Sequence, residues 1–457
     1  MSSISASKRI KGWMMYDWAS QPYHTLILTF IFGPYFAEQL IAHLSATGLD
    51  EATARAQAQS IWGAGLTIAG VSIAVLAPIL GAIADGTGRR MPWIWIFSAC
   101  YIVGATGLWI ASPTDFPTYT VLAFFILGMI GVEFTTIFTN AMLPSLGTKE
   151  EIGKVSGDGW AWGYVGGVLA LILMLVFFAE NATGVTLIGS APLFGLDPEA
   201  REGTRFVGPF VAIWFALSMI PFFLWVREPK GTGMNIGTAV TSGLASLGKT
   251  LKSLPSRQSL LAYLMSSMFY RDALNGVFAF GGVYALGVLQ WSVVSVGVFG
   301  ILAALSGAIF TYVGGFQDRK FGPKPVIIFC IIALIIICVA IISITRESVL
   351  LIPVSSDSSL PDIAFYVCGV SLGAVGGVIQ SASRTMMVRQ ADPERMTEAF
   401  GLFALSGKAT SFLAPSLIAA ATALTNSQRL GITPLIGLFL IGLILLAWVT
   451  PDGEKVK

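Results

Sequence analysis

Long apolar segments alternate with short polar ones along nearly the whole chain. Each apolar segment reaches the ~20 residues that a helix needs to cross the ~30 Å hydrocarbon core of a bilayer, so we expect membrane-spanning helices. The segments are much longer than the ~10 alternating residues of a membrane β-strand. The twelve predicted spans are residues 12–41, 61–84, 92–111, 117–143, 158–180, 209–226, 259–288, 293–315, 325–345, 363–389, 397–424 and 431–450.

Polar side chains inside these spans recur in the first, fourth, seventh and tenth, whereas spans 3, 6, 9 and 12 carry no charge in their interiors. Charges in hydrocarbon are costly and usually face a partner or a wet cavity. A period of three helices is typical of a transporter built from 3+3 repeats. We favour this interpretation over scattered structural polar residues. The predicted substrate-binding residues are Gln21, His24, Asn140, Arg271, Asp272, Asn275, Gln380 and, on span 11, Lys408.

Two carboxylates are candidates for coupling transport to protons. Glu133 lies within span 4, where a buried carboxylate can be neutralised reversibly. The alternative is a fixed ion pair with Lys408 or Arg271. Asp17 lies nearer the cytoplasmic end of span 1, where it would serve proton coupling or gating. Arg271 could be partly neutralised by the adjacent Asp272 and still attract a carboxylate.

A Gly-x-x-x-Asp sequence followed by basic residues occurs twice, at Gly81 to Asp85 and at Gly314 to Asp318. Glycine permits tight packing where a helix ends, and the aspartate can pair with basic residues or with helix N-termini. Breaking such pairs would let two halves separate on the cytoplasmic side. The predicted gating residues are Asp85, Arg89, Arg90, Asp318, Arg319 and Arg384.

The spans divide into an N-terminal six-helix bundle (1–226), a cytoplasmic linker (227–257) and a C-terminal six-helix bundle (258–457). Within the linker, Ala239 to Leu254 has leucines at helical spacing, which predicts an amphipathic helix at the membrane surface; the alternative is a flexible linker. Two glycine series at four-residue spacing predict close helix packing rather than ligand binding: Gly159, Gly163, Gly167 and Gly369, Gly373, Gly377.

Composition agrees with a membrane protein, since 55% of the residues are hydrophobic and 11% are charged, against about 25% charged in soluble domains. With both termini in the cytoplasm, 20 of the 27 lysines and arginines lie on the cytoplasmic side, as the positive-inside rule requires. We expect the cytoplasmic (inner) membrane of a bacterium. The polar, basic start of the chain shows no cleavage pattern, so we expect no removable signal peptide.

Several function classes are disfavoured. All four cysteines fall inside predicted spans, and the two histidines, His24 and His43, have no partners at ligand spacing, so we expect no metal and no cofactor. The loops contain no nucleophile–base set, metal motif or phosphate loop, so we do not expect an enzyme. No basic cluster requires nucleic acid as a partner.

The two Gly-x-x-x-Asp loops resemble the signature between helices 2 and 3, and between 8 and 9, of the major facilitator superfamily. They depart from it at Gly86, where a basic residue usually follows the aspartate, and by one extra residue before Gly322. Longer tracts resemble the vacuole-effluxer-like family: 16–20, 28–36, 140–144, 155–161, 280–284, 376–384, 398–402 and 406–408. The chain departs from that family at Gln21-Pro22-Tyr23, where small residues are commoner.

The resemblance implies an all-α membrane protein with the major facilitator fold: twelve transmembrane helices in two six-helix bundles, each with 3+3 inverted repeats. It also implies secondary active transport by alternating access in a monomer. Fungal members of the family are associated with amino-acid release from the vacuole. The expected partners are a small-molecule substrate, protons or another coupling ion, and the lipid bilayer.

We therefore expect a proton-coupled transporter of a small polar organic solute, with an amino acid as the leading candidate. Arg271 or Lys408 would bind the carboxylate of such a zwitterion, and Glu133 or Asp272 its amine. One alternative is an exporter of amphiphiles or drugs, suggested by aromatic residues such as Trp160 and Trp162. Another is a non-transporting membrane receptor or assembly factor.

Overall fold

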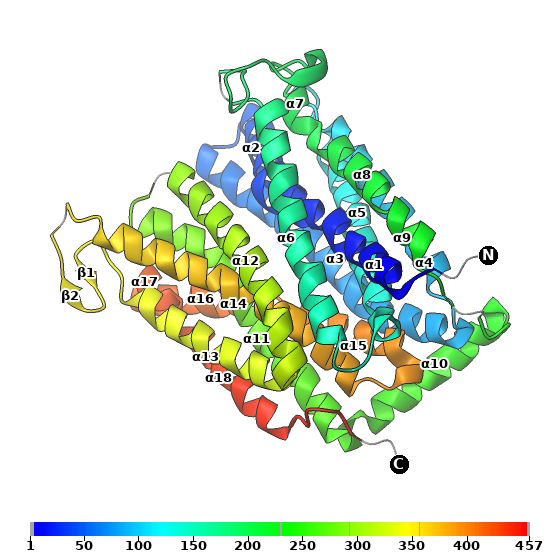
Figure 1. Cartoon of the computed structure of the whole chain (residues 1–457). Helices are drawn as coiled ribbons and strands as arrows, with labels where there is room; N and C mark the ends of the chain where they lie inside the picture. The colour runs from blue at the N-terminus through cyan, green and yellow to red at the C-terminus, as the bar shows by residue number, and fades with distance from the viewer. Residues whose placement is uncertain (1–3, 182, 229–230, 292, 356, 455–457) are drawn as a thin grey trace. The chain divides into compact units, whose positions relative to one another are not determined.

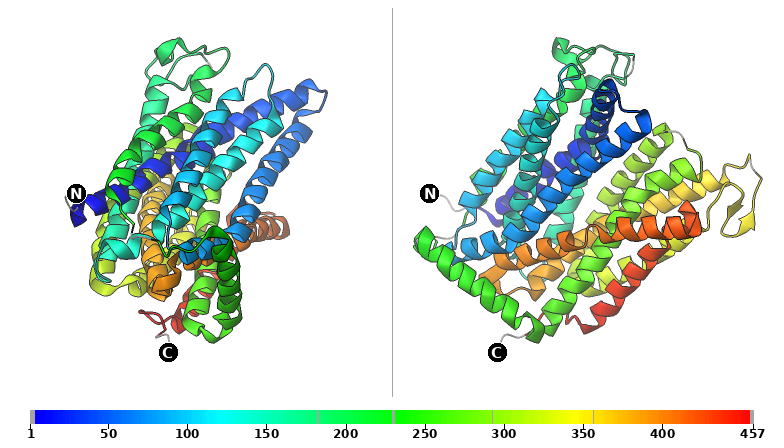
Figure 2. Two further views of the ribbon diagram at one scale, coloured as in Figure 1. Left: turned by 90° about the vertical axis from the view of Figure 1, so that its right-hand side faces the viewer. Right: turned by 180° about the vertical axis from the view of Figure 1, so that it is seen from behind.

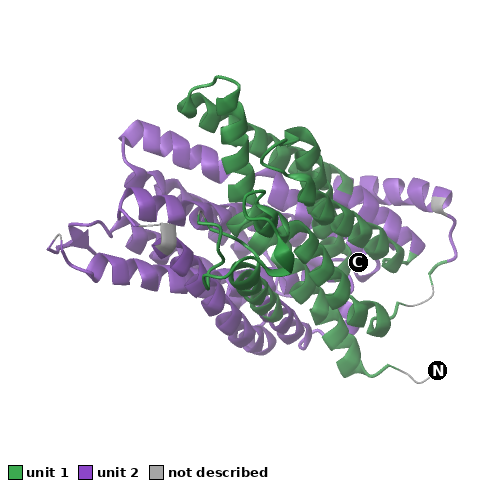
Figure 3. Ribbon diagram, turned by 90° about the horizontal axis from the view of Figure 1, so that it is seen from above, with its two compact units in different colours: residues 1–76, 88–139, 162–232 green, residues 77–87, 140–161, 233–457 purple. Residues whose placement is uncertain are grey.

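The computed structural model describes residues 4–181, 183–228, 231–291, 293–355 and 357–454. Pro229 and Lys230 of the predicted linker lie outside the described residues. Packing divides the chain into two compact units (Figure 3). Unit 1 comprises Met1–Leu76, Gly88–Thr139 and Trp162–Thr232, and unit 2 comprises Ala77–Thr87, Asn140–Ala161 and Gly233–Lys457. The division into bundles at 226 and 258 remains a prediction.

The predicted all-helical membrane architecture is confirmed. In the described part of the chain, eleven helical segments are long and apolar enough to cross a membrane. The remaining predicted span, 259–288, coincides with α11 (Gln258–Gly287), whose hydropathy is reduced by Arg271, Asp272 and Asn275. The described strands form one short antiparallel hairpin, β1 (Ser348–Val349) with β2 (Ile352–Pro353).

Unit 1 holds the N-terminal helices (Figure 1). Its elements are α1 (Ala6–Pro22), the π-helix η1 (Tyr23–Phe30), α2 (Phe32–Ala46), α3 (Glu51–Thr87) as far as Leu76, α4 (Met91–Gly107), the 3₁₀ helix η2 (Leu108–Ile110), α5 (Thr118–Asn140) as far as Thr139, α6 (Ile152–Phe177) from Trp162, the 3₁₀ helix η4 (Leu193–Gly195), α7 (Glu202–Arg205), α8 (Val207–Ser218) and α9 (Ile220–Trp225).

Aromatic side chains of the first span fasten it to α5 in unit 1. The Trp13 indole donates to the Thr139 carbonyl at 2.8 Å, and the Tyr16 hydroxyl to the Val132 carbonyl at 3.0 Å. Tyr23 donates to the Phe125 carbonyl at 2.8 Å. Since positions rise along the first span as they fall along α5, the two run antiparallel. Each buried polar group on these aromatic rings thus has the partner that burial demands.

Unit 2 contains short N-terminal segments and all the later helices. Its elements are the end of α3 (77–87), the 3₁₀ helix η3 (Leu143–Leu146), the start of α6, α10 (Ile236–Ser253), η5 (Leu254–Ser256), α11, α12 (Val293–Phe321), α13 (Pro323–Ile342), the hairpin, α14 (Leu360–Gln390), η6 (Pro393–Arg395), α15 (Met396–Ala409), α16 (Leu413–Thr425), α17 (Gln428–Gly431), α18 (Thr433–Leu445) and η7 (Leu446–Trp448). Helix α14 packs along α12 and α13, and α11 packs on α18 and α15.

Close packing is confirmed at two glycines of each predicted series. In unit 1, Gly163 of α6 lies against the Asp17 backbone, and Gly167 lies against Gln21 and Thr25. In unit 2, Gly369 and Gly373 of α14 bring its backbone against Phe299 and Ala303 of α12. Any side chain at Gly373 would overlap the Ala303 carbonyl.

The span predicted at 397–424 is confirmed as a candidate membrane segment, Pro393–Thr425, but its helix is interrupted. The chain leaves helical geometry after Ala409 and resumes at Leu413, giving α15 and α16 (Figures 1 and 2). Pro415 explains the break, because it has no N–H to donate and its ring collides with the carbonyl four residues earlier. The first span is also irregular, since the π-helix η1 joins α1 to α2.

The linker contains the predicted helix, α10, with Asn235 capping its N-terminus through a hydrogen bond from the Thr238 N–H at 2.8 Å. Its leucines do not share one environment. Leu247 is 7% exposed, whereas Leu244 and Leu251 are 45% and 48% exposed. The leucines of α10 are therefore divided: one packs inside the protein, and two lie on an outer surface. Binding of this helix to the membrane surface remains a prediction.

Candidate substrate and gating sites

Unit 1 brings four of the predicted site residues onto the first span and α5. Asp17, Gln21, His24 and Glu133 are all half-buried. Asp17 follows Tyr16, and Glu133 follows Val132, whose carbonyl accepts the hydrogen bond from the Tyr16 hydroxyl. Both carboxylates act electrostatically on the Tyr16 hydroxyl. The role of the two carboxylates in proton coupling remains a prediction.

The π-helix η1 buries Tyr23 fully but leaves His24 half-buried. Tyr23 is fully buried, with its ring against Gly128, Tyr101 and Phe125, so it packs the helices together. His24 remains half-buried, and its carbonyl accepts the Thr29 hydroxyl at 2.8 Å, which satisfies one backbone group of the irregular turn. Such π-bulges are frequent at functional sites.

Arg271 and Asp272 of α11 hold the two halves of the interrupted span. The Arg271 guanidinium donates to the Phe403 carbonyl at 3.0 Å, lies 4.1 Å from the Phe403 ring centroid and rests on Gly407, all in α15. Asp272, 2% exposed, accepts the Ala414 N–H of α16 at 2.9 Å. These consecutive residues of opposite charge thus bind different partners on either side of the break.

The N–H of Ala414 is one of the groups that a helix N-terminus leaves without an intrahelical partner, and Ala414 is fully buried. Asp272 satisfies that donor and places a negative charge at the positive end of α16. This accounts for an aspartate at this position without a ligand. The role predicted for Asp272 in binding a substrate amine remains a prediction.

The other predicted binding residues of unit 2 occupy varied settings. Asn275 is exposed, and the Gln380 amide donates to the Gly376 carbonyl of its own helix at 3.2 Å. Lys408 is half-buried in the last turn of α15 and follows Gly407, on which Arg271 lies. Two cationic residues therefore adjoin the same turn, just before the break.

Arg384 and Asn140, predicted for different roles, belong to one cluster in unit 2. Arg384 is 3% exposed; its Nε donates to the Ser156 hydroxyl at 2.9 Å and its Nη2 to the Ser156 carbonyl at 2.7 Å. Its Nη1 donates to Asn140 Oδ1 at 3.2 Å, and the guanidinium lies 5.8 Å from the Trp160 ring centroid. The Ser156 hydroxyl in turn donates to Ser381. Ser156 lies in the 155–161 tract that carries the family resemblance, but no role was predicted for it from the sequence.

Asp85 caps the N-terminus of α15. Its carboxylate accepts the Thr397 N–H at 3.2 Å, the Thr397 hydroxyl at 2.6 Å and the Glu398 N–H at 2.8 Å. Gly81 makes the approach possible, because a Cβ there would lie 2.5 Å from the Thr397 carbonyl oxygen. The helix-terminus contact expected of the first Gly-x-x-x-Asp copy is present.

The second copy differs. Asp318 is 1% exposed and lies against Gly153 in the first turn of α6, but neither of its oxygens makes a hydrogen bond in the described part of the chain. The nearby Thr385 hydroxyl donates to Ser381 instead, at 3.3 Å. Arg319 is exposed. Two loops of the same sequence pattern therefore have unequal hydrogen bonding.

The linker helix α10 lies over the segment that carries Asp85. Gly243 lies against the backbone of Ala82 and Ile83, and Gly86 against Ala239. At the other end of the helix, Arg395 donates to the Thr250 hydroxyl at 3.0 Å. The helix therefore contacts both segments that Asp85 joins, a role that its leucine pattern did not predict.

In unit 1, Arg90 lies at the start of α4, where Glu228 accepts the N–H groups of Arg90 and Met91 at 2.6 and 2.9 Å. Arg89, together with Glu228 and Trp95, lines a surface hollow of the same unit. Glu228 had no role in the sequence analysis. The described residues contain no group of three or more His, Cys, Asp or Glu side chains that could hold a metal ion.

Helices of this length and hydropathy, with polar residues inside several spans, indicate an integral membrane transport protein. The family described as "Vacuole effluxer Atg22 like" matches residues 5–456, and the chain belongs to that family. The resemblance inferred from the sequence tracts is thereby confirmed.

Relatives of the chain are transporters and not enzymes, as expected. The chain is 24% identical over 448 residues to "Uncharacterized MFS-type transporter YxiO" of Bacillus subtilis, covering 98% of this chain and 96% of that protein. It is 23% identical over 309 residues to "Autophagy-related protein 22" of Cryptococcus neoformans, covering 66% of this chain. The match spans only about half, 51%, of the fungal protein's length.

Solved structures share the fold. The human organic anion transporter MFSD10 aligns with a TM-score of 0.71 at 15% identity, covering 96% of this chain and 99% of that one. The proton:xylose symporter XylE aligns with a TM-score of 0.67 at 13% identity, covering 97% and 94%. At such identities the likeness extends to the fold alone.

Proposed function

We propose that this major facilitator transporter moves a small polar organic solute that carries a carboxylate, with an amino acid as the leading candidate, and that protons drive it. The observation that carries the proposal is the interrupted span of unit 2. There, Arg271 rests on Gly407 and Lys408 is the next residue, so two cationic residues adjoin one turn within the membrane segment.

An anionic group of a substrate would interact favourably with cationic side chains in a low-dielectric region. Interrupted helices in the membrane are also a recurring way to build transporter binding sites, because they present backbone groups to a ligand. Arg271 offers the planar, two-pronged donor that matches a carboxylate. The organic anion transporter MFSD10 and the proton:xylose symporter XylE share the fold of this chain, which is compatible with the proposal.

Within the proposal, Glu133 and Asp17 of unit 1 carry the coupling proton, since a carboxylate in a span can be charged and neutralised reversibly. Gln21, His24, Asn275 and Gln380 supply polar contacts. The contacts of Asp85, and those of Arg384 with Asn140 and Ser156, hold a closed state whose release is one step of alternating access. Asp318 and the basic residues Arg89, Arg90 and Arg319 act in gating.

Uptake of labelled amino acids and other small carboxylates into proteoliposomes tests the proposal, with and without an imposed proton gradient. We expect one solute to accumulate with the gradient, Lys408→Ala to abolish its binding, and Glu133→Gln to abolish gradient-driven accumulation. Binding that Lys408→Ala leaves unchanged would remove this residue from the site. No flux of any carboxylate, with flux of an uncharged amphiphile, would favour amphiphile export instead.

A further inference from the structure

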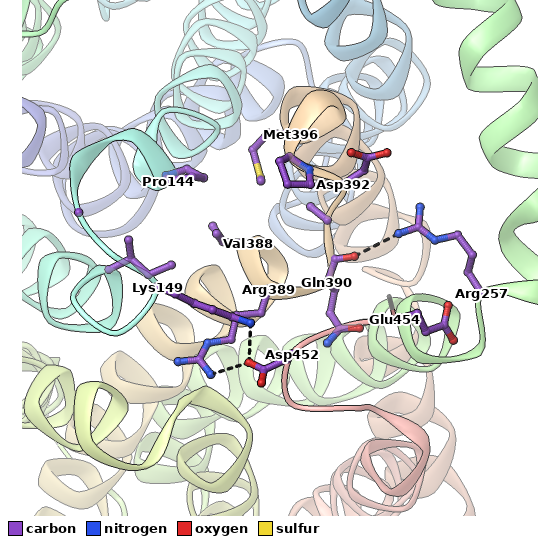
Figure 4. Close-up of a pocket in the computed structure, with 14 residues that line it drawn as sticks. Pro144, Lys149, Arg257, Val388, Arg389, Gln390, Asp392, Met396, Asp452 and Glu454 are labelled. Carbon is purple, nitrogen blue, oxygen red and sulfur yellow. Dashed lines mark hydrogen bonds and ion pairs between the residues drawn. The ribbon is translucent and has the colours of Figure 1, made fainter. Parts of the chain in front are cut away.

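A pocket of about 430 Å³, with charged side chains among its lining residues, lies in unit 2, apart from the residues to which the proposed transport function assigns roles (Figure 4). It is formed by the segment before α6, the end of α14, the residue before α11 and the residues after η7. The charged side chains that line it are Lys149, Arg257, Arg389, Asp392, Asp452 and Glu454.

Two of the three carboxylates are engaged with helix N-termini. Glu454 Oε1 accepts the Ser259 N–H at 2.7 Å, in the first turn of α11. Asp392 Oδ1 accepts the Glu394 N–H at 3.1 Å, in η6. Asp452 pairs with two cations of the pocket: Oδ1 lies 2.7 Å from Lys149 Nζ and 3.3 Å from Arg389 Nη1.

The cations have more donors than these acceptors satisfy. Arg389 has a side chain only 12% exposed, and its Nε is buried without a hydrogen-bond partner among the described residues. Arg257 donates from Nη2 to a neutral acceptor, the Gln390 carbonyl, at 3.3 Å. Asp452, whose own side chain is 67% exposed, pairs with Arg389 and Lys149, whereas the hydrogen bond of Arg257 goes to a carbonyl oxygen. Buried donors of this kind normally have acceptors.

We infer that this pocket binds a small soluble anion that presents a carboxylate or phosphate group to Arg257 and Arg389. Guanidinium groups bind such oxyanions through paired, charge-assisted hydrogen bonds. Asp452 acts as a tethered counter-ion of Arg389 and Lys149, and its exposure lets it leave when the ligand enters. Ligand and Asp452 therefore compete for Arg389 and Lys149.

Isothermal titration of the purified full-length protein with inorganic phosphate and with succinate, at ionic strength held constant with sodium chloride, tests the inference. We expect saturable binding of at least one of these probes. Arg257→Gln should weaken it about tenfold or more, because one charge-assisted pair is lost. Asp452→Asn should strengthen it, since the competitor loses its charge.

The matched control is Arg55→Gln, which removes an arginine that pairs with Glu51 on the exposed surface, where Arg55 is 65% exposed. It should leave the affinity unchanged. Equal weakening by Arg55→Gln and Arg257→Gln, or no gain from Asp452→Asn, would overturn the inference, as would the absence of saturable binding. If the protein bound only to nanodiscs that contain phosphatidylglycerol, and bound neither free phosphate nor succinate, the inference of a soluble ligand would be overturned in favour of a lipid headgroup.

Discussion

At the scale of single residues, Asp85 and Asp318 show how one sequence pattern can meet two environments. Both aspartates lie four residues after a glycine and next to the first turn of a helix. Asp85 accepts three hydrogen bonds, whereas Asp318 is buried with none in the described part of the chain. The two carboxylates should therefore respond in opposite ways to the loss of charge.

Asp85→Ala should destabilise the protein by about 1–2 kcal/mol, the usual cost of removing an N-terminal cap. Asp318→Asn should be neutral or stabilising, because it removes a buried charge that makes no hydrogen bond. Thermal unfolding of both variants in detergent, followed by tryptophan fluorescence, measures the contrast. Equal destabilisation by the two substitutions would contradict it.

A pH effect is expected at the Lys149–Asp452 pair, which lies outside the spans. The hydrogen bond from Lys149 holds the pKa of Asp452 below its ordinary value of 3.8, and the charges of Lys149 and Arg389 act in the same direction. A lowered pKa means that the pair stabilises the fold above about pH 3.8 and that this contribution is lost as the pH falls further.

The difference in melting temperature between wild type and Asp452→Asn should therefore stay constant from pH 7 to 5 and shrink below pH 4. The difference should be small because Asp452 is largely exposed. For Lys149→Gln, which removes the other partner, the difference in melting temperature from wild type should likewise stay constant from pH 7 to 5. A difference that already fades between pH 7 and 5 would assign the effect to another group.

At the scale of elements, the interrupted span and the linker helix are the features that most affect function. A break between α15 and α16 leaves backbone groups without helical partners, and α11 supplies side chains for both sides. The linker helix in turn packs through Gly243 on the segment that carries Asp85. Both arrangements depend on contacts between elements that are distant in the sequence.

Asp272→Ala should cost about 1–3 kcal/mol of stability, since the buried Ala414 N–H loses its acceptor. Asp272→Asn should cost less, because the amide oxygen can still accept that hydrogen bond. Unfolding measured beside substrate binding separates this structural role from the predicted amine-binding role. If Asp272→Asn abolished binding while stability was unchanged, the amine-binding role would be favoured.

The linker helix offers a matched pair of glycines. A Cβ at Gly243 would lie 3.0 Å from the Ala82 backbone, whereas no atom lies within 4 Å of a Cβ built at Gly248. Both alanine variants gain helix propensity, about 0.5–1 kcal/mol. Gly248→Ala should therefore stabilise the protein, and Gly243→Ala should be less stable than Gly248→Ala by roughly 1 kcal/mol or more because of overpacking. Equal melting temperatures would exclude a packed role for Gly243.

At the scale of the whole molecule, transport by alternating access requires closed contacts to open and re-form. In unit 2 the end of α3 is joined to the start of α15 through Asp85, and the start of α6 is joined to α14 through Arg384 and Ser156. These contacts connect N-terminal and C-terminal parts of the chain, so the proposed cycle must break them.

Asp85→Cys with Thr397→Cys should allow transport to be stopped by cross-linking, because the two native side chains approach to 2.6 Å. The test uses a background in which the four native cysteines are replaced. Oxidation should abolish solute exchange in proteoliposomes, and reduction should restore it. Each single-cysteine variant should be insensitive to oxidation. Exchange that continues in the fully cross-linked protein would show that this contact does not open.

The sequence by itself determined the helical membrane fold and most of its span boundaries. Every backbone polar group in hydrocarbon must be satisfied within its own segment, so an apolar run of sufficient length specifies a helix. Local chemistry likewise predicted the linker helix and the glycine packing. The apolar run at 397–424 predicted the span, and Pro415 was the signal in the sequence for the break within it.

Only the tertiary structure decided which partner each polar residue has. Nothing in the sequence pairs Asp272 with the Ala414 N–H, Arg384 with Ser156, or Gly243 with Ala82, because those contacts depend on how separate helices cross. The same holds for the unequal aspartates of the repeated loop. The anion pocket is the clearest case: segments near residues 149, 257, 389 and 452 must come together before their charges can be compared, so no local pattern could predict it.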